Sequence, residues 1–66
     1  MSVGGNIRHI REEKGYSQRE LGNMVGVAQS MICQIERGTK ALSFQLSVDI
    51  AKALECDIKE LAGEEA

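Results

Sequence analysis

The residues with the clearest chemical potential lie in one short stretch, VGVAQSMICQIERG, between Val25 and Gly38. Its polar residues are mostly short and uncharged, namely Gln29, Ser30, Cys33 and Gln34, followed by a single Arg37. Glutamine and serine both donate and accept hydrogen bonds, and glutamine can pair with the adenine edge in the major groove of DNA. Charged side chains attract phosphates but carry little sequence information. The pattern is therefore typical of a surface that reads bases, although uncharged polar residues could also simply solvate a helix.

The same stretch has the spacing of an amphipathic helix. At about 100° per residue, its apolar residues fall on one face, which holds Ala28, Met31, Ile32 and Ile35. The opposite face is polar and holds Ser30, Cys33 and Arg37, with Gln29 and Gln34 beside them. We expect the apolar face to pack on the core and the polar face to project outward.

No other group of residues favours catalysis or metal binding. His9 is the single histidine and has no Cys, Asp or second His near it in sequence. Cys33 and Cys56 lack zinc or redox spacing, so both are expected to be free thiols. An enzyme would need a pair of titratable side chains, a further residue that assists them and a pocket for the substrate. The chain offers no such set. We expect no enzyme activity, no cofactor and no metal.

Length and composition indicate a single small domain, residues 1–66, with an aliphatic core. The chain has one Tyr, one Phe and no Trp or Pro. A domain of this size is marginally stable unless it packs efficiently or self-associates. Its apolar runs are only a few residues long, too short for a membrane span. No basic leader with an apolar segment opens the sequence, so we expect a cytoplasmic protein.

The net charge of −2 argues at first against a nucleic-acid partner, but the charge is unevenly distributed. Residues 1–40 carry six basic and four acidic side chains, a net charge of +2. Residues 41–66 carry two basic and six acidic side chains, a net charge of −4. The N-terminal part is thus the one suited to face phosphates.

Glycines separate five stretches of helical spacing, and no stretch alternates with period two. Gly4-Gly5 is interpreted as a break before the first helix. The sequence predicts helices over Asn6–Lys14, Ser17–Val25, Ala28–Arg37, Ser43 to Leu54 or Glu55, and a short one from Asp57 to Leu61. Capping boxes at Ser17–Glu20 and Asp57–Glu60 support two of the starts. The fold is therefore expected to be all-α and compact, with residues 63–66 as a frayed tail.

The segment Ser17 to Arg37 is the most informative part of this pattern. It joins two short helices by a tight turn that contains Gly26. A corner of a few residues with glycine sets a steep crossing angle, which lets the second helix project from the body of a helix-turn-helix unit. A glycine between two helices is weak evidence alone. Combined with the polar face and the neighbouring basic residues, it favours DNA binding.

These residues carry a family resemblance. The stretches IRHIREEKGYSQRELGNMVGVAQSMICQIERG and IAKAL resemble the Xre, or Cro/phage-repressor-like, helix-turn-helix family over nearly all of residues 6–61. The resemblance implies a compact five-helix domain that docks its third helix in the major groove. It also implies a partner, double-stranded DNA, and usually a dimer on an operator.

Carried over position by position, the resemblance implies roles for individual residues. The base-reading positions are Gln29, Ser30 and Gln34. The resemblance places Gln18, Thr39 and Lys40 at positions that contact the DNA backbone, and we expect the basic side chains of Arg19 and Arg37 to contact it as well. Arg11 and Glu36 match a family pair that links the first and third helices through an internal ion pair.

Several positions depart from the family pattern. Ala28 stands where Ser or Thr commonly caps the third helix, a loss of roughly 1 kcal/mol. Gly22 replaces a usual Ala, at a place where a small residue is needed. Ser47 replaces a core Leu, while Leu46 takes a usually polar position and could form an apolar surface for a partner. Met24, Met31 and Cys56 are expected in the core.

The sequence therefore predicts a sequence-specific DNA-binding transcriptional regulator, most simply a dimeric repressor on a palindromic operator. The dimer contact is expected in the C-terminal half, from about Leu46 to Leu61, where apolar residues outnumber those that a short helix pair can hide. An alternative is an antitoxin-type interaction module that binds a partner protein and autoregulates. Co-purification of a small neighbouring protein would favour this alternative.

Overall fold

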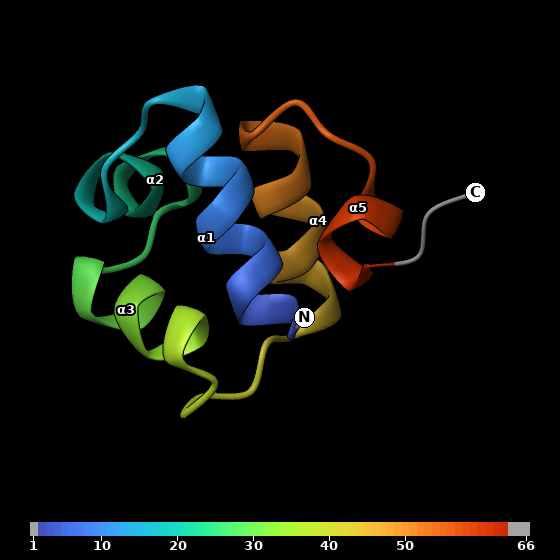
Figure 1. The fold of residues 1–66 in the computed structure, drawn as a ribbon. Helices are drawn as coiled ribbons and strands as arrows, with labels where there is room; N and C mark the ends of the chain where they lie inside the picture. The colour runs from blue at the N-terminus through green and yellow to red at the C-terminus, as the bar shows by residue number, and fades with distance from the viewer. Residues whose placement is uncertain (1, 64–66) are drawn as a thin grey trace.

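The structure is a computed structural model that describes residues 2–63. Within this range the chain forms five helices, α1 (Val3–Lys14), α2 (Gln18–Val25), α3 (Gln29–Arg37), α4 (Phe44–Ala53) and α5 (Ile58–Ala62). Figure 1 shows α1 in the middle of the domain, with α2 and α3 on one side and α4 and α5 on the other. The predicted all-α, five-helix fold is confirmed. Of the predicted frayed tail at residues 63–66, Gly63 is ordered as the C-cap of α5, and residues 64–66 lie outside the described residues.

The first helix starts earlier than the sequence predicted. Ser2 caps α1, its Oγ accepting from the backbone N–H of Gly5 at 3.0 Å. Gly4 therefore lies inside the helix, and the interpretation of Gly4-Gly5 as a break is wrong. The cause is tertiary: a Cβ on Gly4 would meet the carbonyl oxygens of Ile35 and Glu36. The glycine lets α1 pack directly on the backbone of α3.

The predicted corner between α2 and α3 is present. Ser17 and Glu20 form the predicted capping box, and Gly26 ends α2 with φ of 77°, a conformation that favours glycine. A Cβ on Gly22 would lie 2.7 Å from the carbonyl oxygen of Val27, which explains why a small residue is needed there. Ala28 has the extended conformation of an N-cap but offers no side-chain hydrogen bond, as predicted.

The core is aliphatic and lies where all five helices meet. Its buried apolar residues are Ile7, Leu21, Ile32, Ile35, Leu46, Ile50, Ala51, Leu54 and Leu61. Met31 and Cys56 are half-buried and pack against this cluster. The expectation of a core position for Met24 is wrong, because 45% of this residue is exposed.

The start of α4 determines which of its apolar residues face the core. Ser43 caps the helix through the N–H of Leu46. In this register Leu46 turns inward and is only 9% exposed, whereas Phe44 is 78% exposed. The expectation that Leu46 forms an apolar surface is therefore wrong, and Phe44 takes that place. Ser47 is half-buried and its hydroxyl donates to the carbonyl of Phe44.

One buried polar residue joins the two ends of the domain. Asn6 is buried in α1, and its Nδ2 donates to the carbonyl oxygen of Leu61 at 3.1 Å. This bond satisfies a carbonyl at the end of α5. The predicted capping box of Asp57 and Glu60 is present at the start of the same short helix. The link between residues 55 positions apart has no counterpart in the local sequence pattern.

Candidate nucleic-acid interface

The outer face of α3 carries the three candidate base-reading residues. Ile32 and Ile35 are buried in the core. Gln29, Ser30 and Gln34 are exposed on the other side of the helix. The structure thus brings these three polar side chains to one outward surface. Their role as base readers stays a prediction.

A buried ion pair holds α3 against α1. Arg11 Nε donates to Glu36 Oε2 at 2.7 Å and Arg11 Nη2 donates to Oε1 at 3.1 Å. The Arg11 and Glu36 side chains are only 9% and 3% exposed. The hydrogen bond to Glu36 raises the pKa of Arg11 above its ordinary value, although burial acts in the opposite direction. The guanidinium also donates to the carbonyl of Tyr16 at 2.8 Å, which ties in the turn before α2.

Gln18 joins this network, which the sequence did not predict. Its Nε2 donates to Glu36 Oε1 at 3.0 Å, so that one carboxylate receives bonds from α1 and α2. Hydrogen bonds to the Glu36 carboxylate thereby join the three helices α1, α2 and α3. No local pattern could have revealed this contact, because it spans 18 positions. The proposed phosphate contact of Gln18 stays a prediction.

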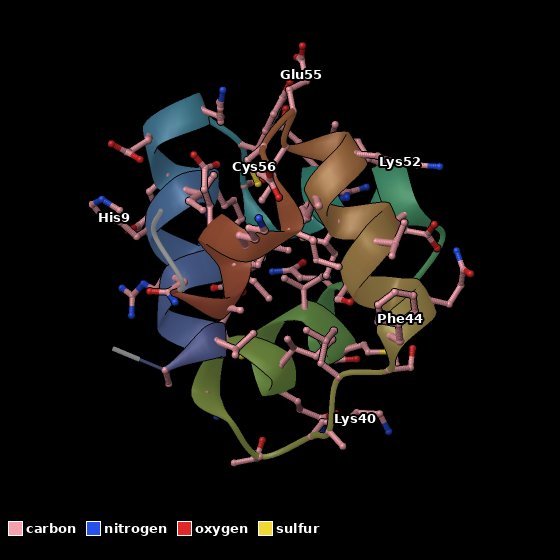
Figure 2. All side chains as sticks on the ribbon, turned by 90° about the vertical axis from the view of Figure 1, so that its right-hand side faces the viewer. His9, Lys40, Phe44, Lys52, Glu55 and Cys56 are labelled. Carbon is pink, nitrogen blue, oxygen red and sulfur yellow. The ribbon has the colours of Figure 1, made fainter. Side chains whose placement is uncertain are left out.

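The other candidate backbone contacts surround α3 at the surface. Arg19 lies in the first turn of α2, Arg37 ends α3, and Thr39 and Lys40 follow in the loop, all of them exposed. Thr39 Oγ1 donates to the carbonyl of Gln34 at 3.2 Å, which places the hydroxyl at the C-terminal end of α3. Figure 2 shows Lys40 on the loop that leads into α4. These residues therefore lie at the two ends of the α2–α3 unit.

Among residues 2–63 there is no group of three or more His, Cys, Asp or Glu residues that could hold a metal ion. Cys33 and Cys56 are both free thiols. Burial, and then the nearby charge of Glu60, raises the pKa of the Cys56 thiol, so that its reactive thiolate is scarce near neutral pH. In the same described range, no helix is long and apolar enough to cross a membrane.

The sequence relatives of the chain include proteins named as uncharacterized HTH-type transcriptional regulators. HTH-type transcriptional regulator y4dL of Sinorhizobium fredii is 46% identical over 52 residues, which cover 79% of this chain and 26% of that protein. HTH-type transcriptional regulator YazB of Bacillus subtilis is 36% identical over 59 residues, which cover 89% of this chain and 86% of that protein. The chain thus spans about a quarter of the first relative and most of the second.

The fold is also that of a repressor solved with DNA. The P22 c2 repressor in complex with a synthetic operator matches with a TM-score of 0.89 and 31% identity, covering 98% of both chains. The family model described as helix-turn-helix matches residues 7–61. Together with the α2–α3 geometry, these matches establish that the chain belongs to the Xre/Cro-type helix-turn-helix family.

Proposed function

We propose that this protein is a cytoplasmic, sequence-specific DNA-binding transcriptional regulator that acts as a dimeric repressor on a palindromic operator. The observation that carries the proposal is the exposed row of Gln29, Ser30 and Gln34 on α3. The inner side of this helix is fixed to the rest of the domain. A recognition helix must keep a defined orientation to place its side chains on base edges. The buried Arg11–Glu36 pair supplies this rigidity, because it fixes α3 to α1.

The proposed contacts divide into two classes. Gln29, Ser30 and Gln34 read base edges, since their side chains can both donate and accept hydrogen bonds. Backbone phosphates are contacted by the half-buried Gln18 and by four exposed residues around α3, which are Arg19, Arg37, Thr39 and Lys40. Contacts of the second kind position the protein and carry no sequence information directly. The P22 c2 repressor, which has a similar fold, has been solved in complex with a synthetic operator, and this supports DNA binding by a fold of this kind.

The proposed dimer uses an apolar face beside the C-terminal end of α3, where Lys40, one of the proposed backbone contacts, also lies. An apolar groove of about 620 Å³ lies between the start of α1, the end of α3 with the loop that follows it, and α5. Val3, Leu42, Ile58 and Ala62 line it, and the exposed ring of Phe44 stands at its edge. Figure 2 looks onto this side, with Phe44 at the start of α4. The residues earlier expected to supply the contact include Leu46 and Leu61, which are already buried in the core.

A two-fold axis suits such a surface, because each protomer offers both a groove and an aromatic ring. Burying one phenylalanine side chain contributes about 1.5–3 kcal/mol. Two symmetric contacts of this size support a weak dimer that operator DNA reinforces. The two recognition helices would then lie about one DNA turn, roughly 34 Å, apart.

The same groove favours a second candidate function. An antitoxin-type module could seat an apolar segment of a partner protein where the second copy would otherwise bind, and autoregulate through α3. Purification of the protein from its native host tests this alternative. A stoichiometric small partner that dissociates when Phe44 is replaced by Glu would support it.

Selection from a random duplex library tests the main proposal. Bound sequences should converge on a site with two-fold symmetry. Sedimentation at micromolar concentration, with and without the selected duplex, should show two protomers on one DNA. Absence of any selected sequence would overturn the DNA-reading function. A single protomer on an asymmetric half-site would overturn the dimer.

A further inference from the structure

A small polar hollow opens beside the base-reading row, where α1, α2 and α3 meet. It has a volume of about 360 Å³ and is lined by Arg8, Arg11, Gln18, Cys33, Glu36 and Arg37. Arg8 and Cys33 have no role in the interactions described above. We infer that this hollow seats one phosphate of the DNA backbone and that Arg8 is a DNA-contacting residue. The inference rests on the proposed function, which it extends from the helix-turn-helix unit to α1.

The electrostatics of the hollow favour an anion. Its lining contains three arginines and one glutamate, a net charge of +2. Glu36 is occupied by Arg11 in the buried pair, so it does not neutralise the other two arginines. No acidic side chain within residues 2–63 forms an ion pair with Arg37. Two guanidinium groups therefore remain at the mouth, and guanidinium matches phosphate geometry through paired hydrogen bonds.

Arg8 is free to turn toward a ligand at little cost. Its only ion pair in the described chain is with Glu12, at 3.5 Å, and the two side chains are 65% and 55% exposed. Exposed pairs of this kind contribute little to stability. When a phosphate binds in the hollow, Arg8 would thus exchange its weak, solvated pair with Glu12 for a charge-assisted hydrogen bond to the phosphate.

The position of the hollow also fits a phosphate. Ser30, Cys33 and Arg37 follow one another along the same side of α3, at spacings of three and four residues. The N-terminal residues of a recognition helix contact base edges. Arg37 lies eight residues beyond Gln29, about 12 Å along the axis. Because residues of α1 and α2 also line it, the hollow flanks the base-reading row on the side of these two helices, where a DNA strand along a wall of the groove would run.

The salt dependence of binding to a mixed-sequence duplex tests this inference. Each phosphate contact adds about 0.9 to the slope of log K against log salt concentration. Arg8→Gln should remove about that amount, which corresponds to roughly eightfold weaker binding at 0.1 M salt. Arg8→Gln with Glu12→Gln keeps the net charge of the native chain and should lose the same slope, since the direct contact is absent. Lys52→Gln, on α4 and outside the hollow, should leave the slope unchanged.

Cys33 supplies a second readout. In a Cys56→Ser background, N-ethylmaleimide reports on Cys33 alone. Mixed-sequence duplex DNA at low salt should slow this labelling several-fold, because a bound strand covers the hollow. Thermal melts should show that the Arg8, Glu12 and Lys52 variants melt like the native chain, as expected for exposed substitutions, and that the half-buried Cys56→Ser background is still folded at the labelling temperature.

The outcomes separate this inference from the proposed function. If the native chain shows neither salt-dependent binding nor a selected site, the proposed function fails. If the native chain binds DNA but the Arg8–Glu12 double variant keeps the native slope, or DNA leaves Cys33 labelling unchanged, the hollow does not seat a phosphate. A smaller salt-dependence slope in the Arg8–Glu12 double variant, together with slower labelling of Cys33 in the presence of DNA, supports the assignment of Arg8 as a phosphate contact.

Discussion

Arg11 and Glu36, 25 positions apart, form a two-bond ion pair with Nε–Oε2 and Nη2–Oε1 distances of 2.7 and 3.1 Å. Both side chains are almost fully buried. The pair lies directly behind the proposed recognition helix and receives a further bond from Gln18. It therefore couples the stability of the fold to the orientation of the surface proposed to read DNA.

Replacing one member of this pair should destabilise the domain. Arg11→Met or Glu36→Gln leaves the other charge buried and unpaired, which should lower the free energy of unfolding by roughly 3–5 kcal/mol. Urea unfolding and thermal melts measure this loss. The Arg11→Met/Glu36→Gln double variant should be less destabilised than the sum of the single variants, because it leaves no unpaired charge. Native melting temperatures in both single variants would contradict a structural role.

Gln29→Ala and Gln34→Ala should weaken binding to the selected operator without unfolding the protein. Each substitution should cost about 1–3 kcal/mol and relax selectivity at one base position. Competition binding with operator variants measures the change. Affinity for a mixed-sequence duplex should stay close to native. Equal losses on operator and mixed DNA would assign these residues to the backbone instead.

Helix capping provides a matched pair of stability predictions. Ala28→Ser should stabilise α3 by about 1 kcal/mol, because the backbone already has N-cap geometry but no side-chain acceptor. Ser43→Ala should destabilise α4 by a similar amount, since it removes the bond to the N–H of Leu46. Chemical denaturation of both variants measures the two opposite shifts. A destabilised Ala28→Ser would show that the α2–α3 corner cannot accommodate a hydroxyl.

Gly4→Ala should destabilise the domain, although alanine normally favours a helix over glycine. The new Cβ would meet the backbone oxygens of Ile35 and Glu36, and overpacking of this kind costs typically about 1–3 kcal/mol. Thermal unfolding measures the loss. A stabilised variant would mean that α1 and α3 can separate without penalty.

Phe44→Ser should weaken self-association and leave the fold of the protomer intact. The ring is 78% exposed, so its removal leaves no cavity in the core. Sedimentation velocity over a range of concentrations measures the association. Met24→Ser is the control, because Met24 is also partly exposed and apolar but does not line the groove. Unchanged association of the Phe44 variant would exclude this face as the dimer contact.

The sequence alone determined most of the helices and the corner between α2 and α3. The Ser17–Glu20 and Asp57–Glu60 capping boxes and the turn at Gly26 are formed by residues close together in the chain. Interactions of this range depend on local backbone geometry, and a local pattern therefore predicts them. The apolar spacing of α3 likewise predicted the burial of Ile32 and Ile35, whereas Ala28, expected on the same face, is exposed at the N-cap.

Only the tertiary structure decided the features that depend on contacts between distant segments. Gly4 belongs to a helix because α3 approaches it closely, and Asn6 is buried because it satisfies the end of α5. Leu46 turns inward while Phe44 and Met24 remain exposed, although all three are equally apolar in a sequence pattern. Gln18 reaches Glu36, and Arg8 reaches the edge of a hollow, through the packing of three helices. These outcomes depend on how the helices pack, and residue spacing within one helix carries no information about the shape of its neighbours.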